Sequence, residues 1–98
     1  MIEVLAGNTV RFTNTFYNFE QKPTDPNIIK IKVYDHTYKL IEEVNLGLNN
    51  RISDGKFFYD YHTPPEPDRA YIIEFYGEIS GNPTFERELI KTTFLKRK

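Results

Sequence analysis

Ninety-eight residues, with 13 basic and 14 acidic side chains and a net charge of −1, are enough for one domain with a buried core. Charges this evenly balanced favour neither nucleic acid nor an anionic membrane as a partner. The chain has no cysteine, which excludes disulfides and thiolate metal sites. Seven tyrosines, eight phenylalanines and many β-branched residues accompany only two alanines, and this composition is typical of strands.

The N-terminal half alternates apolar and polar residues in short runs. Residues 2–6 predict a first strand, and residues 9–17 predict a longer one after the turn signal Gly7-Asn8. Residues 18–27 contain two prolines, each of which removes a backbone donor, so they predict a loop. Residues 28–34 show the clearest strand pattern, because isoleucine and valine occupy every second position.

The middle of the chain is less clear. Asp35-His36-Thr37 predicts a turn. Residues 38–45 place Leu40, Ile41 and Val44 at helical spacing, but the segment is short and its neighbours are strands, so we predict a strand with a helix as the alternative. Residues 46–55 predict a connection that ends in an Asp-Gly turn.

The C-terminal half predicts three more strands, at residues 56–62, 69–79 and 84–95. The proline-rich residues 63–68 predict a stiff loop between the first two. In the last strand the apolar face changes parity between Leu89 and Ile90, which predicts a bulge. About seven strands in one chain predict an all-β antiparallel sandwich, with a barrel as the alternative architecture.

Two segments resemble known sandwich families. Pro-Asp-Arg-Ala-Tyr-Ile-Ile-Glu-Phe at 67–75 resembles the penultimate strand of fibronectin-type and macroglobulin-type domains. That resemblance implies a tyrosine corner at Tyr71, whose hydroxyl would bond to the upstream backbone. Ser-Asp-Gly-Lys-Phe-Phe-Tyr at 53–59 resembles the turn and strand of prealbumin-like and macroglobulin-like domains, which implies a turn at Asp54 and Gly55.

Together with residues 7–12, these segments cover most of the chain in the order that such families show. The resemblance implies an immunoglobulin-like sandwich, although antibody-type domains carry cysteines and tryptophan that this chain lacks. In general style the sequence also resembles small proteins of tailed bacteriophages and prophages.

The whole chain, 1–98, is expected to form a single domain with a basic tail at 96–98. That tail is interpreted as a solvated end or as an electrostatic contact with a partner or with DNA. No run of about 18 apolar residues could span a membrane, and Glu3 interrupts a short N-terminal apolar stretch unlike a signal peptide. We therefore expect a free-standing, cytoplasmic or virion-associated protein.

Side chains that could carry chemistry are few. The histidines, His36 and His62, each follow a predicted strand, and neither belongs to a nucleophile motif. His36 beside Asp35 and His62 near Asp60 are weak metal pairs. Calcium would need convergence of acidic loop residues, namely Asp54, Asp60, Glu66 and Asp68. The sequence predicts no enzyme, no cofactor and no metal site.

The surplus of aromatic residues is the feature that bears most on function. Tyr34, Phe58, Tyr76 and Tyr17 fall on the parity opposite the predicted core. They can cover an outer sheet face, form a protein interface or serve as a carbohydrate platform. We expect a non-enzymatic structural or protein-interaction module, with a structural component of a phage or prophage as the specific expectation. It would bind a protein or a second copy through strand edges, and the alternative is a module that binds carbohydrate or a cell surface.

Overall fold

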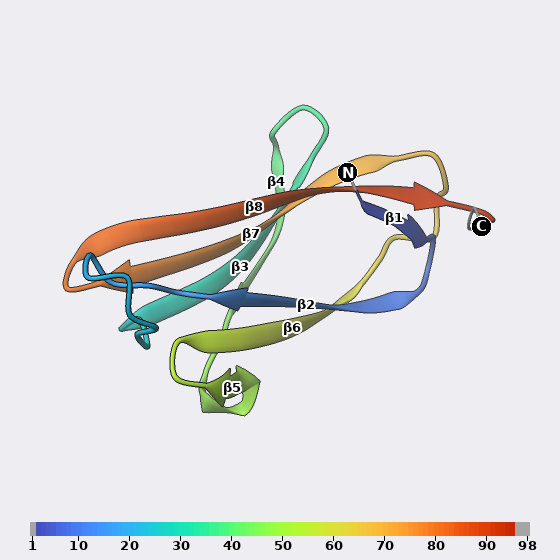
Figure 1. The fold of residues 1–98 in the computed structure, drawn as a ribbon. Coiled ribbons are helices and arrows are strands. Elements are labelled where there is room, and N and C mark those ends of the chain that lie inside the picture. The colour runs from blue at the N-terminus through green and yellow to red at the C-terminus, as the bar shows by residue number, and fades with distance from the viewer. Residues whose placement is uncertain (1, 96–98) are drawn as a thin grey trace.

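The computed structural model describes residues 2–95, which form two β-sheets packed face to face (Figure 1). One sheet has five strands in the order β1-β8-β7-β3-β4, and the other has three in the order β2-β6-β5. Neighbouring strands are antiparallel except β1, which runs parallel to the end of β8. The strands are β1 (Ile2–Leu5), β2 (Thr9–Thr15), β3 (Ile28–Asp35), β4 (Leu40–Asn45), β5 (Arg51–Ser53), β6 (Lys56–His62), β7 (Ala70–Ile79) and β8 (Asn82–Thr93).

The core lies between the two sheets and takes every second residue of their central strands. The five-stranded sheet contributes Ile31, Val33, Ile73 and Ile90, which are almost fully buried. Phe16 follows β2 and contacts the rings of both Phe57 and Phe75 edge to face, at centroid distances of 6.2 and 6.5 Å. Such aromatic pairs add about 0.5–1.5 kcal/mol each to simple burial. The two-sheet prediction is thereby confirmed.

In the ambiguous segment 38–45, Leu40–Asn45 form the strand β4, and the helical spacing of its apolar residues has a local cause. The pairing of β3 with β4 shifts between Val33 and Tyr34, so that Val33 lies opposite Glu42 but Tyr34 lies opposite Leu40. Ile41 is therefore the extra residue of a bulge. The predicted connection 46–55 also contains two elements that the residue pattern does not predict, the single turn η1 (Leu48–Asn50) and the short strand β5.

The prediction of a bulge in the last strand is wrong. Pairing between β7 and β8 runs without a shift from Ala70 opposite Lys91 to Ile79 opposite Asn82. Phe85 and Leu89 instead lie on the outer face of the sheet, where both remain half-exposed. The apparent change of parity arose because apolar side chains occupy the inner face near Ile90 and the outer face near Phe85.

Lys96-Arg97-Lys98, the basic tail, lies outside the described residues. Within residues 2–95 no helix is long and apolar enough to cross a membrane.

Candidate interaction surfaces

Three of the four aromatic residues that parity places opposite the core, Tyr34, Phe58 and Tyr76, do not form one surface. Tyr34 on β3 and Tyr76 on β7 share the outer face of the five-stranded sheet. Phe58 on β6 lies on the outer face of the other sheet, opposite Thr13 of β2. All three side chains are half-buried rather than exposed. A single partner surface would therefore have to use either the tyrosines or Phe58.

On the five-stranded sheet, the outer aromatics surround a buried carboxylate. The side chain of Glu74 is only 1 % exposed although it points away from the core. Its Oε1 accepts a hydrogen bond from Arg87 Nε at 2.7 Å, and its Oε2 lies 3.5 Å from the hydroxyl of Tyr34. Burial and the nearby charge of Glu74 raise the pKa of Tyr34. These contacts form a polar cluster around the carboxylate, and a hollow beside the cluster is lined by Tyr34, Tyr38, Ile72 and Arg87.

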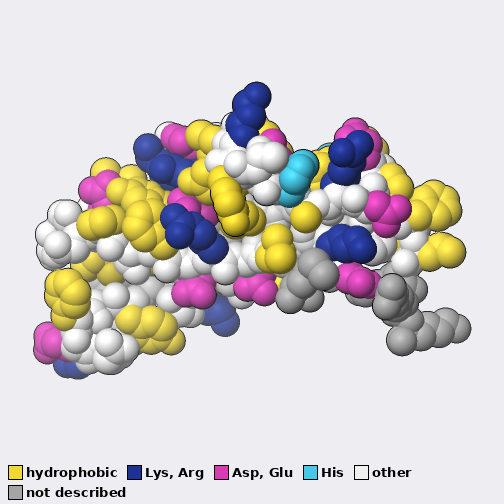
Figure 2. Space-filling view, turned by 90° about the horizontal axis from the view of Figure 1, so that it is seen from above, with side chains coloured by type: hydrophobic (Ala, Val, Ile, Leu, Met, Phe, Trp, Pro, Cys, Tyr) yellow, Lys and Arg dark blue, Asp and Glu magenta, His cyan; other side chains and the backbone are white. Residues whose placement is uncertain are grey.

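Tyr76 takes part in a second group beside that cluster. The centres of the Tyr76 and Phe85 rings are 5.2 Å apart, and the ammonium nitrogen of Lys32 lies 4.8 Å from the centre of the Tyr76 ring. The hydroxyl donates to Glu78 at 2.6 Å, and this bond raises the pKa of Tyr76. Figure 2, seen from the side of β7 and β8, shows hydrophobic side chains in separate groups among charged ones. These contacts are those of a covered sheet face.

Phe58 is covered in a similar way. The guanidinium of Arg11 lies 4.0 Å from the centre of its ring. Arg11 is held there by two hydrogen bonds to the carboxylate of Asp60, at 2.7 and 2.9 Å. This pairing lowers the pKa of Asp60. The structure thus engages Phe58 in a cation–π contact rather than leaving its face open.

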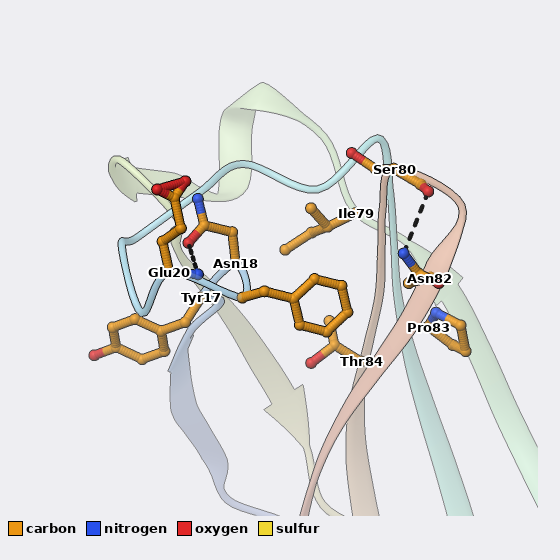
Figure 3. A pocket seen from close by; sticks show the side chains of 9 residues that line it. Tyr17, Asn18, Glu20, Ile79, Ser80, Asn82, Pro83 and Thr84 are labelled. Atoms are coloured by element: carbon orange, nitrogen blue, oxygen red, sulfur yellow. Dashed lines mark hydrogen bonds between the residues drawn. The ribbon is translucent and has the colours of Figure 1, made fainter.

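A hollow at one end of the sandwich, here called the end hollow, leaves apolar side chains open (Figure 3). Its volume is about 280 Å³. It lies between the loop that follows β2 and the turn that joins β7 to β8, whose side chains form opposite walls. Phe19 is 88 % exposed beside it and Tyr17 is 51 % exposed. The lining residues are Tyr17, Asn18, Phe19, Glu20, Ile79, Ser80, Asn82, Pro83 and Thr84.

The loop that carries Phe19 is braced by one side chain. Asn18 Oδ1 accepts hydrogen bonds from the backbone N–H groups of Glu20 and Lys22, at 2.9 and 3.1 Å. The Asn18 N–H in turn donates to the carbonyl of Lys22 at 3.0 Å. A braced loop loses little conformational freedom when its aromatic tip binds. Phe19 was not predicted from the sequence, where the only signal was an aromatic residue next to an asparagine inside a polar loop.

Asp54 and Gly55 form the tight turn between β5 and β6, where the resemblance placed them. Gly55 has a φ of +71°, and a Cβ there would lie 2.5 Å from the backbone nitrogen of Thr24. Asp25 Oδ1 accepts the N–H of Gly55 at 2.7 Å, and Arg51 Nε donates to Asp25 Oδ2 at 2.8 Å. These contacts fix the loop 18–27, and with it the end hollow.

Tyr71 is buried at the start of β7, but its hydroxyl forms no hydrogen bond to another group within residues 2–95. Threonines hold the proline-rich loop instead. Thr92 Oγ1 donates to the carbonyl of Glu66 at 2.7 Å and accepts the N–H of Arg69 at 3.2 Å. At the other end of the loop, Thr63 Oγ1 donates to the carbonyl of Asn8 at 2.7 Å.

The histidines lie apart from the end hollow. His36 is in the turn between β3 and β4, and His62 ends β6 with Nδ1 3.2 Å from the hydroxyl of Thr9. Across residues 2–95, no three His, Asp or Glu side chains are grouped as a metal site would require.

Two tyrosines point into the sandwich. The hydroxyl of Tyr59 donates to the carboxylate of Glu42 at 3.2 Å, and burial raises the pKa of Tyr61 to about 12.

Comparison with protein-family models, curated proteins and solved structures finds no match to this chain.

Proposed function

We propose that this domain is a non-enzymatic structural or protein-interaction module whose contact surface is the end hollow. The observation that supports this function is the placement of Phe19, which is 88 % exposed on a braced loop. Exposed aromatic anchors beside an apolar depression are typical of protein contacts. The aromatics of both sheet faces, in contrast, are engaged by charged neighbours of their own chain.

We infer an immunoglobulin-like variant of the sandwich from the strand order. In such folds the third strand pairs with the penultimate strand, which in turn pairs with the last strand, and the second strand lies in the other sheet with strands from the middle of the chain. Here β3 pairs with β7, and β7 pairs with the last strand, β8. In the other sheet β2 pairs with β6, and both pairings support this assignment. We also propose a role as a structural component of a phage or prophage. The neighbouring genes test that role, since capsid, portal or tail genes are expected and an unrelated operon would contradict it.

Site-specific photo-crosslinking in the native host tests the contact surface. A photoreactive phenylalanine analogue replaces Phe19, and a matched variant carries it at Tyr38, which is 76 % exposed on the β3–β4 turn. We expect a discrete protein adduct from position 19 and none from position 38. Equal, diffuse labelling from both positions would contradict the proposal.

Carbohydrate binding is the second candidate, because the end hollow combines aromatic side chains with the polar groups of Asn18, Glu20 and Asn82. Aromatic faces with a few convergent polar groups are typical of small-molecule sites. A glycan array probed with the full chain and with a Tyr17→Ala variant separates the two functions. Binding that Tyr17→Ala abolishes would favour carbohydrate, and an empty array would remove this candidate.

A further inference from the structure

We propose that copies of this chain associate head to tail, with Phe94 and Leu95 of one copy in the end hollow of the next. This inference rests on the proposed function, and it names the partner as a second copy. Its evidence is the match between the two ends of one elongated molecule.

The two surfaces lie at opposite ends of the molecule. The end hollow borders the β7–β8 turn, whereas Phe94 and Leu95 follow the last residue of β8 (Figure 1). The 12 residues of β8 span roughly 40 Å at about 3.4 Å per residue, and the longest dimension of the molecule is 41 Å. The strand β8 therefore runs along the whole length of the molecule, with the end hollow at one end and the apolar pair, Phe94 and Leu95, at the other.

Both ends leave apolar side chains in water. Phe94 is 79 % exposed and Leu95 is 77 % exposed. In Figure 2 hydrophobic side chains lie towards both ends of the elongated outline as well as along its middle. The end hollow has a volume of about 280 Å³, and Ile79 and Pro83 are among its lining residues. Phe94 and Leu95 of the same copy do not line it. Joining the two ends would remove both apolar surfaces from water.

The charges near the two ends are complementary. Lys96, Arg97 and Lys98 follow the apolar pair directly in the sequence. Glu20 lines the hollow, and Glu86 follows Thr84 on the same face of β8. Neither carboxylate forms an ion pair with another described residue. A basic segment that arrives with Phe94 and Leu95 would meet these acidic groups, so the association should weaken with added salt.

A symmetric pairing of strand edges fits less well. Within the described chain, β1 covers only Ile90–Thr93, so the first part of β8 has a free edge. Glu86 and Glu88 point inward along that edge, and pairing with a second copy of the same edge would bring carboxylates together. The end-to-end contact is instead heterologous, joining two different surfaces, and it repeats into a filament or a ring.

Sedimentation velocity on the full chain and on three variants tests the inference. Phe94→Ser/Leu95→Ser removes the inserted pair, Phe19→Ser alters the hollow, and Tyr38→Ser is the control, with folding checked by circular dichroism. We expect the wild type and the control to grow beyond twice the monomer mass with concentration, and each end variant to stay monomeric. An equal mixture of the two end variants should form a species of twice the monomer mass, because one hollow and one apolar pair remain intact.

Three results would overturn the inference: a monomeric wild type at every concentration, a mixture that stays monomeric, or equal loss of association in the Tyr38→Ser control. If one of these results is found and position 19 still crosslinks to another protein in the host, the proposed function survives and the second copy is excluded as the partner. If position 19 crosslinks to nothing, both proposals fail.

Discussion

The carboxylate of Asp25 accepts a 2.7 Å hydrogen bond from the backbone N–H of Gly55, which ties the loop before β3 to the turn before β6. The carbonyl of Gly55 accepts the N–H of Phe16 at 2.8 Å, and Phe16 begins the segment that carries Phe19. The conformation of the end hollow thus depends on a turn in the opposite half of the sequence.

Replacing Gly55 by alanine should destabilise the domain more than the same change at Gly81. Both glycines have positive φ, +71° and +79°, for which alanine pays about 1–2 kcal/mol. At Gly55 the new Cβ would also lie 2.7 Å from the carbonyl oxygen of Phe16, whereas nothing lies within 4 Å at Gly81. This overpacking adds about 2 kcal/mol or more. Urea unfolding measures the difference, and equal losses at the two sites would contradict this account of the turn.

Asp25→Asn should lower the stability at neutral pH and lose this effect in acid. The hydrogen bond from the backbone N–H of Gly55 lowers the pKa of Asp25 below its usual 3.8, and the side chain of Arg51 lowers it to a smaller extent. A lowered pKa stabilises the fold above the unfolded value, and the contribution disappears as pH falls through the folded value. The side chain is 44 % exposed, so solvent screening limits the loss to about 1 kcal/mol. Unfolding at pH 7 and below pH 3.8 tests this, and a gap that does not change with pH would contradict it.

The alternation of residues predicted most strands because these strands have one buried face. β3 and β6 follow it closely, with Ile31, Val33, Phe57 and Tyr61 buried. β5 escaped prediction because its three residues are too few for a pattern and none is buried. The bulge at Ile41 escaped because the pairing of strands distant in sequence determines it.

Arg87→Met should be costly because it leaves the carboxylate of Glu74 buried without its cation. Removing one partner of a buried pair costs about 3–5 kcal/mol, and replacing both by apolar groups costs far less. Arg87 is 57 % exposed, so we expect about 2–3 kcal/mol for the single change. The double variant Glu74→Met/Arg87→Met should recover most of this loss in thermal unfolding. A double variant less stable than Arg87→Met would contradict the proposed role of the pair.

Thr92→Val should loosen the proline-rich loop with little change in volume. The variant leaves the carbonyl of Glu66 and the N–H of Arg69 without their hydroxyl partner, which costs about 1–3 kcal/mol. Thr93→Val is the control, since its hydroxyl makes a single long bond of 3.4 Å to Val4. Hydrogen exchange at Arg69 should accelerate in the Thr92 variant only. Similar exchange in both variants would show that another group holds the loop.

The site was harder to predict than the fold. Parity alone favoured Tyr34, Phe58 and Tyr76 as interaction residues, and parity gives the face of a sheet but not what covers that face. Arg11 covers Phe58 and Lys32 covers Tyr76, each from a neighbouring strand, whereas the hydroxyl of Tyr34 lies 3.5 Å from the carboxylate of Glu74. Phe19 lies in a loop, where no periodicity applies, and the wall opposite it comes from the β7–β8 turn.

The most direct test of the proposed contact surface is an amide NMR dilution series on the wild-type chain. Head-to-tail association predicts concentration-dependent shifts at residues 17–20, 79–84 and 93–95, the two ends of the molecule, and unchanged amides in β4 and β5. Spectra that do not change with concentration, or shifts confined to the strand edges of β4 and β5, would contradict it.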